Sequence, residues 1–380
     1  MERPDVTRET VAVVVDSAFG LTVVDTSPLA SYDDVNVLVH VTDATENSYV
    51  KSVAKTGYVL KILNSVDTQK TEFIDVMHGA IERVSRAGIA TSRPVRTKTG
   101  NQFEIVPIHS KTGSEYRFLV RLFEYVPGEV LEDKPYTAPL CYQVGRLGGR
   151  LDNALLDYRP PELMGHSRHW NLRLAGSIAD QTYVIKDAGR RTLILEVVRK
   201  FQTNVLDRGE LLRRGTIHGD LNEGNIIVRK ENLNHPDTCG DSCTNETYVV
   251  HGILDFGDLV YEYHVFEVAI AITYIMIETK HGIDPVDAGG HVLAGYLGEC
   301  PLPAEDLRVV KDCVTARLAQ SLTYGAMAHH KDPSNTYCLR TSVRGWPLLK
   351  ELWDMPESEL YKRWNRTLKT YGIDAIKNLL

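Results

Sequence analysis

The pattern of apolar positions changes about one third of the way along the chain. In the first 130 residues, short runs rich in β-branched and aromatic residues predict strands at 35–41, 58–63, 102–108 and 117–125. Between Glu72 and Arg86 the apolar residues recur at helical spacing, and Gly88 follows as a C-cap would. From Pro139 onward helical spacing dominates, and it predicts helices at 140–156, 193–212, 265–279, 286–297 and 305–328 and in the tail 335–380.

This change predicts an α+β, bilobal fold. We expect a small lobe at 1–127, made of an antiparallel sheet with one helix, and a larger, mainly helical lobe at 128–380. Two short strands interrupt the helices of the larger lobe, Ile226–Val228 and Val249–Leu254, and we expect them to pair as a hairpin around a polar loop at 230–247. A chain of 380 residues that is 43% hydrophobic can bury a core in each lobe.

Composition and charge exclude several classes of protein. The net charge of -7 gives no basic field for nucleic acid, and no apolar run reaches membrane-spanning length. The first residues lack the apolar core of a signal peptide. Cys239 and Cys243 lie close together in the polar loop, but no nearby His or Cys pair completes a zinc pattern, so we expect free thiols in a reducing compartment. These features predict a cytoplasmic enzyme without nucleic-acid or membrane partners.

The predicted hairpin carries the residues with the clearest chemistry. The first strand follows His-Gly-Asp-Leu-Asn-Glu-Gly-Asn at 218–225, and the second ends in Asp-Phe-Gly at 255–257. In protein kinases, a loop Asp acts as the base for the acceptor hydroxyl, while a following Asn and the Asp of Asp-Phe-Gly bind Mg²⁺. We therefore predict Asp220 as the base and Asn225 and Asp255 as Mg²⁺ ligands, since Mg²⁺ prefers oxygen donors. Each stretch alone is also typical of an ordinary turn, but the two together in this order favour a phosphotransferase.

The small lobe offers a second charged group inside an apolar strand. Lys61 would cost free energy there unless it met an anion, so we predict that it binds nucleotide phosphates and pairs with a carboxylate on the following helix. Glu72, Asp75 and Glu82 are the candidates for that carboxylate, and we prefer Asp75. The alternative is a lysine at a strand edge that extends into water.

The segment Ser31–Asn36 lies where a glycine-rich phosphate loop is expected, but it contains no glycine. The Ser31 hydroxyl and backbone amides can cap phosphates, with Asn36 stabilising the turn. An ordinary acidic turn is an equally open interpretation.

These motifs together resemble the aminoglycoside phosphotransferase and choline kinase superfamily, whose loop reads His-Gly-Asp-x-x-x-x-Asn, with Gly219 where protein kinases have Arg. Longer segments resemble a narrower family, the animal hydroxylysine kinases, from about residue 10 to the C-terminus. They include Leu29–Asn36, Tyr58–Ile62, Tyr125–Gly128, Gly252–Asp258, Val265–Ile270 and Gly289–Gly295.

The resemblance implies a protein kinase-like fold and the GTP-dependent phosphorylation of 5-hydroxy-L-lysine to 5-phosphohydroxylysine, in lysine and hydroxylysine breakdown. It assigns the roles given above to Lys61, Asp220, Asn225 and Asp255. It also places the strand Leu119–Phe123 against the purine, which backbone groups of its exit, Glu124 to Val126, would read. The preference for GTP over ATP is carried by the resemblance alone.

The acceptor leaves alternatives open. A kinase of homoserine, choline, ethanolamine or an aminoglycoside would use the same motifs with ATP or GTP, and a pseudokinase would bind nucleotide without transfer, although the intact motif residues argue against it. Hydroxylysine carries one carboxylate and two amines, so acids and an Arg are expected near it. The candidates are Asp258, Glu262, Glu267 and Arg317, with Trp170, Tyr263 and Tyr324 against the aliphatic stem. A helix cap for Glu267, a surface ion pair for Arg317 and core positions for the aromatic residues are the competing interpretations.

Overall fold

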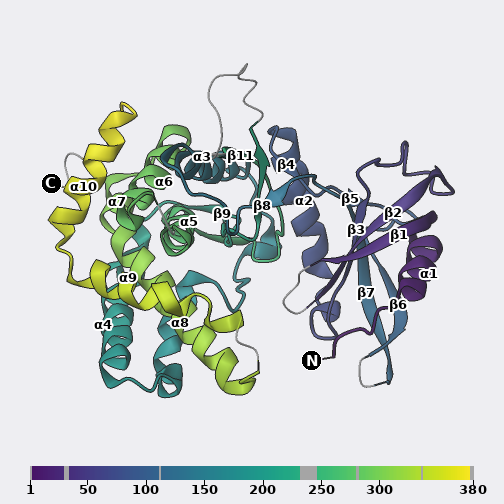
Figure 1. The fold of residues 1–380 in the computed structure, drawn as a ribbon, viewed down its shortest axis with the longest axis horizontal. Helices are drawn as coiled ribbons and strands as arrows, with labels where there is room; N and C mark the ends of the chain where they lie inside the picture. The colour runs from purple at the N-terminus through teal and green to yellow at the C-terminus, as the bar shows by residue number, and fades with distance from the viewer. Residues whose placement is uncertain are drawn as a thin grey trace, which may run out of the picture. The chain divides into compact units, whose positions relative to one another are not determined.

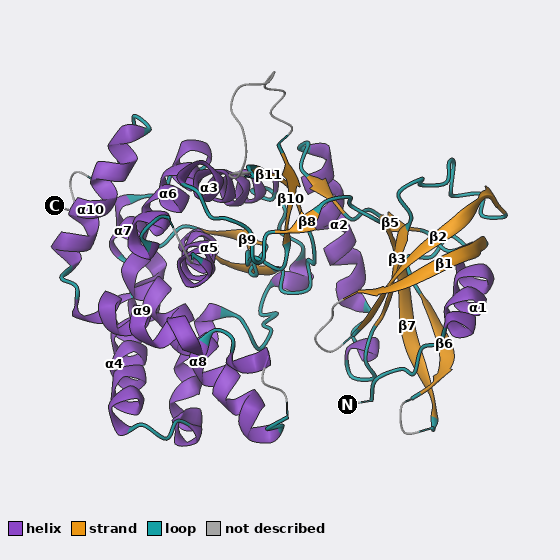
Figure 2. Ribbon diagram, in the orientation of Figure 1, coloured by secondary structure: helices purple, strands orange, loops and turns teal. Residues whose placement is uncertain are grey.

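The computed structural model describes residues 2–29, 34–110, 113–231, 246–279, 282–334 and 337–376. The chain divides into two compact units, Met1–Pro127 and Gly128–Leu380 (Figure 1). Figure 2 shows that strands form most of the first unit and helices most of the second. The α+β fold class predicted from the sequence is confirmed.

The first unit is built on an antiparallel sheet with the strand order β1-β2-β3-β7-β5, and β6 pairs with β7. The strands are β1 (Leu21–Leu29), β2 (Val35–Thr45), β3 (Tyr58–Ile62), β5 (Pro94–Val95), β6 (Glu104–His109) and β7 (Glu115–Glu124). Strand β1 was not predicted, because its apolar periodicity is weak and Pro28 interrupts it. An edge strand such as β1 tolerates a proline.

Two helices pack on opposite faces of this sheet. Helix α1 (Arg8–Phe19), which the sequence analysis did not predict, shares a buried cluster with Val120 and Leu122 of β7. Helix α2 (Glu72–Arg86) lies on the other face, where its Met77 approaches Arg121. Because side chains alternate along a strand and Lys61 pairs in register with Arg121, Lys61 lies on the α2 face.

The second unit contains two small groups of antiparallel strands. Strand β10 (Ile226–Lys230) pairs with β8 (Glu129–Val130) and with β11 (Tyr248–Ile253), which confirms the predicted hairpin. Strand β9 (Arg214–Ile217) pairs with β12 (Val260–Tyr263). The last residues of β9 and β11 lead directly into the two motifs identified in the sequence.

Helices form the rest of the second unit. They are α3 (Ala138–Ala154), α4 (Ala188–Asn204), α5 (His264–Glu278), α6 (Pro285–Glu299), α7 (Ala304–Arg308), α8 (Val310–Lys331), α9 (Ser342–Asp354) and α10 (Glu357–Thr370), with 3₁₀ turns that include η3 (Leu172–Val184) and η4 (Leu206–Leu211). The helices predicted at 193–212 and 305–328 were wrong in extent. In the first region, α4 ends at Asn204 and the 3₁₀ helix η4 follows. In the second, Val309 separates α7 from α8.

Helices α3 and α6 pack with their backbones in contact. A Cβ atom on Gly145 of α3 would lie 1.9 Å from the carbonyl oxygen of Val292, and one on Gly295 of α6 would lie 1.9 Å from that of Tyr142. Helix α5, almost entirely buried, packs against α6 and α8. Within the described residues, no helix is long and apolar enough to cross a membrane.

Candidate active site

The loop that follows β9 begins with a buried histidine that joins the two motifs. His218 is fully buried, and its Nε2 lies 3.0 Å from the carbonyl oxygen of Leu254, the residue after β11. Its Nδ1 accepts a hydrogen bond from the backbone N–H of Asp220 at 3.3 Å. Because Nδ1 accepts, Nε2 carries the ring proton, and its N–H donates a hydrogen bond to the carbonyl oxygen of Leu254. Phe256 packs edge-on against the imidazole, with 4.9 Å between ring centroids.

Gly219 is required by the geometry of the loop. Its φ of 80° lies in the left-handed region, and a Cβ atom there would be 2.5 Å from the carbonyl oxygen of Asp258. Its backbone N–H donates to Oε2 of Glu267 at 2.9 Å. Glu267 is fully buried in the first turn of α5 and stabilises the loop, which is neither of the roles considered for it from the sequence.

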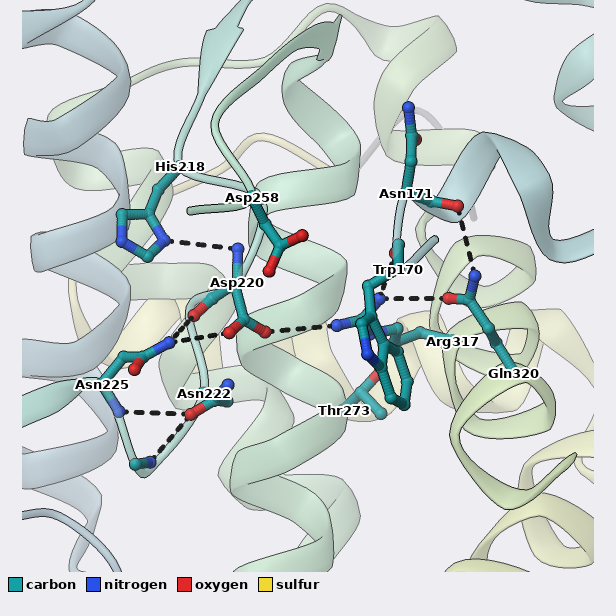
Figure 3. A network of polar contacts seen from close by, with 12 residues as sticks. Trp170, Asn171, His218, Asp220, Asn222, Asn225, Asp258, Thr273, Arg317 and Gln320 are labelled. Carbon is teal, nitrogen blue, oxygen red and sulfur yellow. Dashed lines mark hydrogen bonds and ion pairs between the residues drawn. The ribbon is translucent and has the colours of Figure 1, made fainter. Parts of the chain in front are cut away.

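Asp220 and Asn225 contact each other across the turn between them. The Asn225 Nδ2 donates to Oδ2 of Asp220 at 2.7 Å and to its backbone oxygen at 2.9 Å (Figure 3). Asn222 closes the turn, since its Oδ1 accepts from the backbone N–H groups of Gly224 and Asn225. The Asp220 side chain keeps 22% of its surface exposed. The predicted base and one predicted metal ligand therefore share one rigid turn.

The Asp255 turn lies against the same loop. The backbone N–H of Leu254 donates to the Asn225 carbonyl at 2.8 Å, and Oδ1 of Asp255 accepts from the N–H of Gly257 at 3.0 Å. Asp255 has a φ of 51°, unusual for a residue other than glycine. Strain of this kind costs about 1 kcal/mol or more and is typical of functional turns.

The carboxylates around these turns concentrate negative charge. Burial and the neighbouring carboxylates Asp220 and Asp255 raise the pKa of Asp258 to about 6, against the opposing effect of Arg168. Burial raises the pKa of Asp220 as well, and the charge of Asp255 adds to this increase. Within the described residues no cluster of three or more His, Cys, Asp or Glu side chains forms a metal site. One carboxylate and one amide in an electronegative setting nevertheless fit Mg²⁺, which completes its shell with water and phosphate oxygens.

A buried arginine approaches Asp220 from the other side. Nη2 of Arg317, in α8, lies 3.4 Å from Oδ1 of Asp220, and its Nη1 donates to the carbonyl oxygen of Trp170 at 2.6 Å and to Oε1 of Gln320 at 3.1 Å. The guanidinium lies over the Trp170 and Tyr274 rings, 5.0 and 5.4 Å from their centroids. Arg317 is fully buried, so the surface ion pair considered from the sequence is wrong.

The other residues considered for the acceptor have partners within the second unit. Glu262 is buried and accepts from Arg173 at 2.5 and 2.7 Å, and Asp258 forms an ion pair with Arg168 at 3.5 Å. Tyr324 stacks on His169 at 4.0 Å, and Trp170 packs edge-on against Tyr324. Tyr263 is buried in the core. These basic partners could not be recognised from local sequence, because they lie far from the acids along the chain.

One acid of the catalytic loop was given no role from the sequence. Glu223 lies between Asp220 and Asn225, and its buried Oε2 has no hydrogen-bond partner among the residues that the structure describes. Burial, together with Glu278 and Asp220, raises its pKa to about 8. Its position between two motif residues was the signal that could have identified it.

In the first unit, the ion pair of Lys61 differs from the prediction. Its Nζ lies 3.4 Å from Oδ2 of Asp34, and the side chains are 15% and 17% exposed. Asp75 is exposed in the first turn of α2 and forms no ion pair with a described residue, so the predicted Lys61–Asp75 pair was wrong. Asn36 was expected to stabilise a turn but lies within β2, in register with Lys61 of β3. Ser31 lies outside the described residues.

The strand exit predicted to face the purine has backbone and side-chain contacts within the first unit. The backbone N–H of Glu124 donates to the Arg93 carbonyl at 2.8 Å, and its carboxylate accepts from Arg93 at 2.6 Å. Val126 is buried. Cys239 and Cys243 lie outside the described residues, whereas Cys141, Cys300 and Cys313 are buried free thiols.

Comparison with known proteins gives a consistent picture. The model of the phosphotransferase enzyme family matches residues 40–299, more than half of the chain. Hydroxylysine kinase of Bos taurus is 34% identical over 98% of this chain and 96% of its own length, and that of Mus musculus is 33% identical over 97% and 95%. Among solved structures, an amicoumacin kinase in complex with AMP-PNP, Ca²⁺ and Ami has a TM-score of 0.62 and 18% identity, covering 92% of this chain and 94% of that one. This structural likeness supports the fold.

Proposed function

Since the chain belongs to the phosphotransferase enzyme family and is an O-phosphotransferase that acts on a hydroxyl group, we propose that it phosphorylates the side-chain hydroxyl of 5-hydroxy-L-lysine. The product is 5-phosphohydroxylysine, and the reaction would serve hydroxylysine breakdown. We propose GTP as the donor, on the strength of the resemblance to animal hydroxylysine kinases.

The observation that carries the reaction class is the turn shared by Asp220 and Asn225 against the Asp255 turn. Phosphoryl transfer requires mainly positioning and charge neutralisation, and this arrangement supplies an acceptor-side carboxylate beside two oxygen ligands. The full-length likeness to hydroxylysine kinases carries the choice of acceptor.

The roles follow from the chemistry of each group. Asp220 orients the acceptor hydroxyl and takes its proton as the new P–O bond forms and the bond between the γ-phosphorus and the β,γ-bridging oxygen breaks, which releases the nucleoside diphosphate. Asn225 and Asp255 would hold Mg²⁺, which neutralises phosphate charge when bound. Lys61 contacts donor phosphates, and the Ser31 hydroxyl together with backbone amides of its segment supports them. Backbone groups at Glu124 and Val126 read the purine.

A panel of acceptors tests the proposal. Purified protein with Mg²⁺ and either GTP or ATP is given 5-hydroxylysine, lysine, homoserine, choline, ethanolamine and an aminoglycoside. We expect nucleotide consumption with 5-hydroxylysine, faster with GTP, and none with lysine, which lacks the acceptor hydroxyl. Faster turnover of another acceptor would replace hydroxylysine, and no turnover of hydroxylysine with either nucleotide would refute the assignment.

A further inference from the structure

Arg317 is a buried cation to which the proposed reaction assigns no role. It is fully buried in the middle of α8, far along the chain from the catalytic loop. A guanidinium buried without compensation is strongly unfavourable, so its contacts must offset the loss of water. Asp220 is the carboxylate that it contacts, at 3.4 Å.

The position of the guanidinium is determined by several independent contacts. Nη1 is held by the Trp170 carbonyl and by Gln320, and Gln320 in turn donates through Nε2 to the Asn171 carbonyl at 3.2 Å (Figure 3). The rings of Trp170 and Tyr274 contact the guanidinium through cation–π interactions. The residues before η3 and helix α8 therefore form a scaffold that directs Nη2 at Asp220.

We propose that Arg317 is a positioning residue that fixes the rotation of the Asp220 carboxylate. Asn225 holds Oδ2 at 2.7 Å and Arg317 approaches Oδ1 at 3.4 Å, so the two oxygens are held from opposite sides. A carboxylate fixed in this way presents the same lone pair to each incoming hydroxyl, and loss of such positioning can reduce the rate about 100-fold. The charge of Arg317 also opposes the increase that burial causes in the pKa of Asp220.

A different role for Arg317 would be to bind the carboxylate of the acceptor. The two roles predict different kinetics. A substrate ligand affects acceptors with a carboxylate, whereas a positioning residue affects every acceptor equally, because it acts through Asp220.

The experiment compares Arg317→Met and Arg317→Lys with the parent protein, on 5-hydroxylysine and on the amine formed by its decarboxylation. For Arg317→Met we expect kcat to fall about 30- to 100-fold on both acceptors, with KM and nucleotide affinity within about threefold of the parent. Arg317→Lys should recover about tenfold of the loss. In the Asp220→Asn background, Arg317→Met should lower kcat by less than about threefold, because the carboxylate that Arg317 positions is absent. An increase in KM confined to the carboxylate-bearing acceptor, or an unchanged kcat, would overturn the proposal.

A matched control separates positioning from general destabilisation. Arg344 of α9 also donates to backbone carbonyls, those of Ile277 and Thr279, and within the described part of the chain it forms no hydrogen bond or ion pair with the loop 218–225. Arg344→Met should lower the melting temperature to a degree similar to Arg317→Met, while kcat stays within about twofold. If Arg317→Met is poorly folded, Arg317→Ala with added guanidinium ion gives the second measurement: recovery of kcat supports positioning, and no recovery in a folded variant contradicts it.

This inference rests on the proposed kinase reaction, but the two can fail separately. Absence of turnover by the parent on every hydroxyl acceptor would count against the proposed function. In that case the Asp220→Asn and Arg317→Met pair is measured by chemical denaturation of single and double variants. If the changes in denaturation midpoint caused by the two substitutions are not additive, they support the contact between Arg317 and Asp220. If the changes are additive, they overturn it.

Discussion

Asp220 and Lys61 are both charged residues that the sequence assigned to catalysis, but their surroundings differ. Asp220 contacts Arg317, a fully buried cation 97 residues away, and Asn225 from its own turn. Lys61 pairs with Asp34, the residue before β2, and the two side chains are 15% and 17% exposed. The difference indicates how strongly each residue should respond to the loss of a neighbour. An ion pair with one fully buried member, Arg317, is sensitive to the loss of either partner, whereas a pair whose members both reach water is screened.

The largest effect is expected from Asp220→Asn. The amide keeps the shape of the carboxylate but cannot take the hydroxyl proton, so kcat should fall about 10³-fold or more, while nucleotide affinity changes less than about threefold. Steady-state kinetics and nucleotide titration measure the two quantities. Equal activity of variant and parent would exclude Asp220 as the base.

Gly219→Ala should have the next largest effect. The φ of 80° costs an alanine about 1–2 kcal/mol, and its Cβ would force the loop away from the Asp258 carbonyl. We expect kcat to fall about 10- to 100-fold, with a lower melting temperature. Gly176→Ala is the control, because a Cβ there meets nothing within 4 Å. If the two variants behave alike, the close approach at Gly219 does not matter.

Variants of Lys61, Asp34 and Asp75 test the ion pair whose two members both reach water. Lys61→Met should raise KM for the nucleotide about tenfold or more, because it removes a phosphate contact. Asp34→Asn should reduce kcat/KM for the nucleotide about threefold, since Lys61 loses its partner, whereas Asp75→Asn should leave it within about 1.5-fold. A larger effect of Asp75→Asn than of Asp34→Asn would instead support Asp75 as the partner of Lys61, as the sequence predicted.

The smallest effect concerns a buried carboxylate outside the site. Asp306 is fully buried, accepts one backbone hydrogen bond from Arg213, and burial raises its pKa to about 6. Its folded-state pKa exceeds the unfolded value, so the folded state binds more protons between about pH 4 and 6 and loses stability as the pH rises through that range.

Asp306→Asn removes this dependence and should therefore raise the free energy of unfolding more at pH 8 than at pH 5. The difference between the two pH values should be at most about 1.4 kcal/mol, because pH 5 lies about one unit below the folded-state pKa. Urea denaturation of parent and variant at the two pH values measures it, and an equal effect at both would contradict the assignment.

The part of the site that depends on local sequence could be predicted. The catalytic loop, the hairpin and the Asp255 turn are encoded by neighbouring residues, so the positions of Asp220 and Asn225 on one turn followed from their spacing. Their catalytic and metal-binding roles stay predictions. Gly88, which the sequence identified as the end of a helix, follows α2 with a φ of 74°.

The parts that depend on distant packing could not be predicted. Nothing near Arg317 in the sequence indicates that α8 points it at Asp220. The choice of Asp75 assumed that the following helix supplies the partner of Lys61, whereas Asp34, the residue before β2, supplies it. Helix α1 was missed because its run of valines is typical of a strand, although Thr7 caps its N-terminus and Gly20 ends it in the left-handed conformation.

The backbone contact between α3 and α6 has a consequence for how likeness to relatives is interpreted. Gly295 belongs to the segment Gly289–Gly295, one of the stretches that tie this chain to hydroxylysine kinases, and its missing side chain is what lets the two helices touch. Gly289 and Gly290 face Met276 and Trp364, again within the core. A stretch whose glycines are needed for helix contact is required by the fold, whichever acceptor the enzyme phosphorylates. Substrate assignment for new members of this group is therefore better judged from the residues around Asp220.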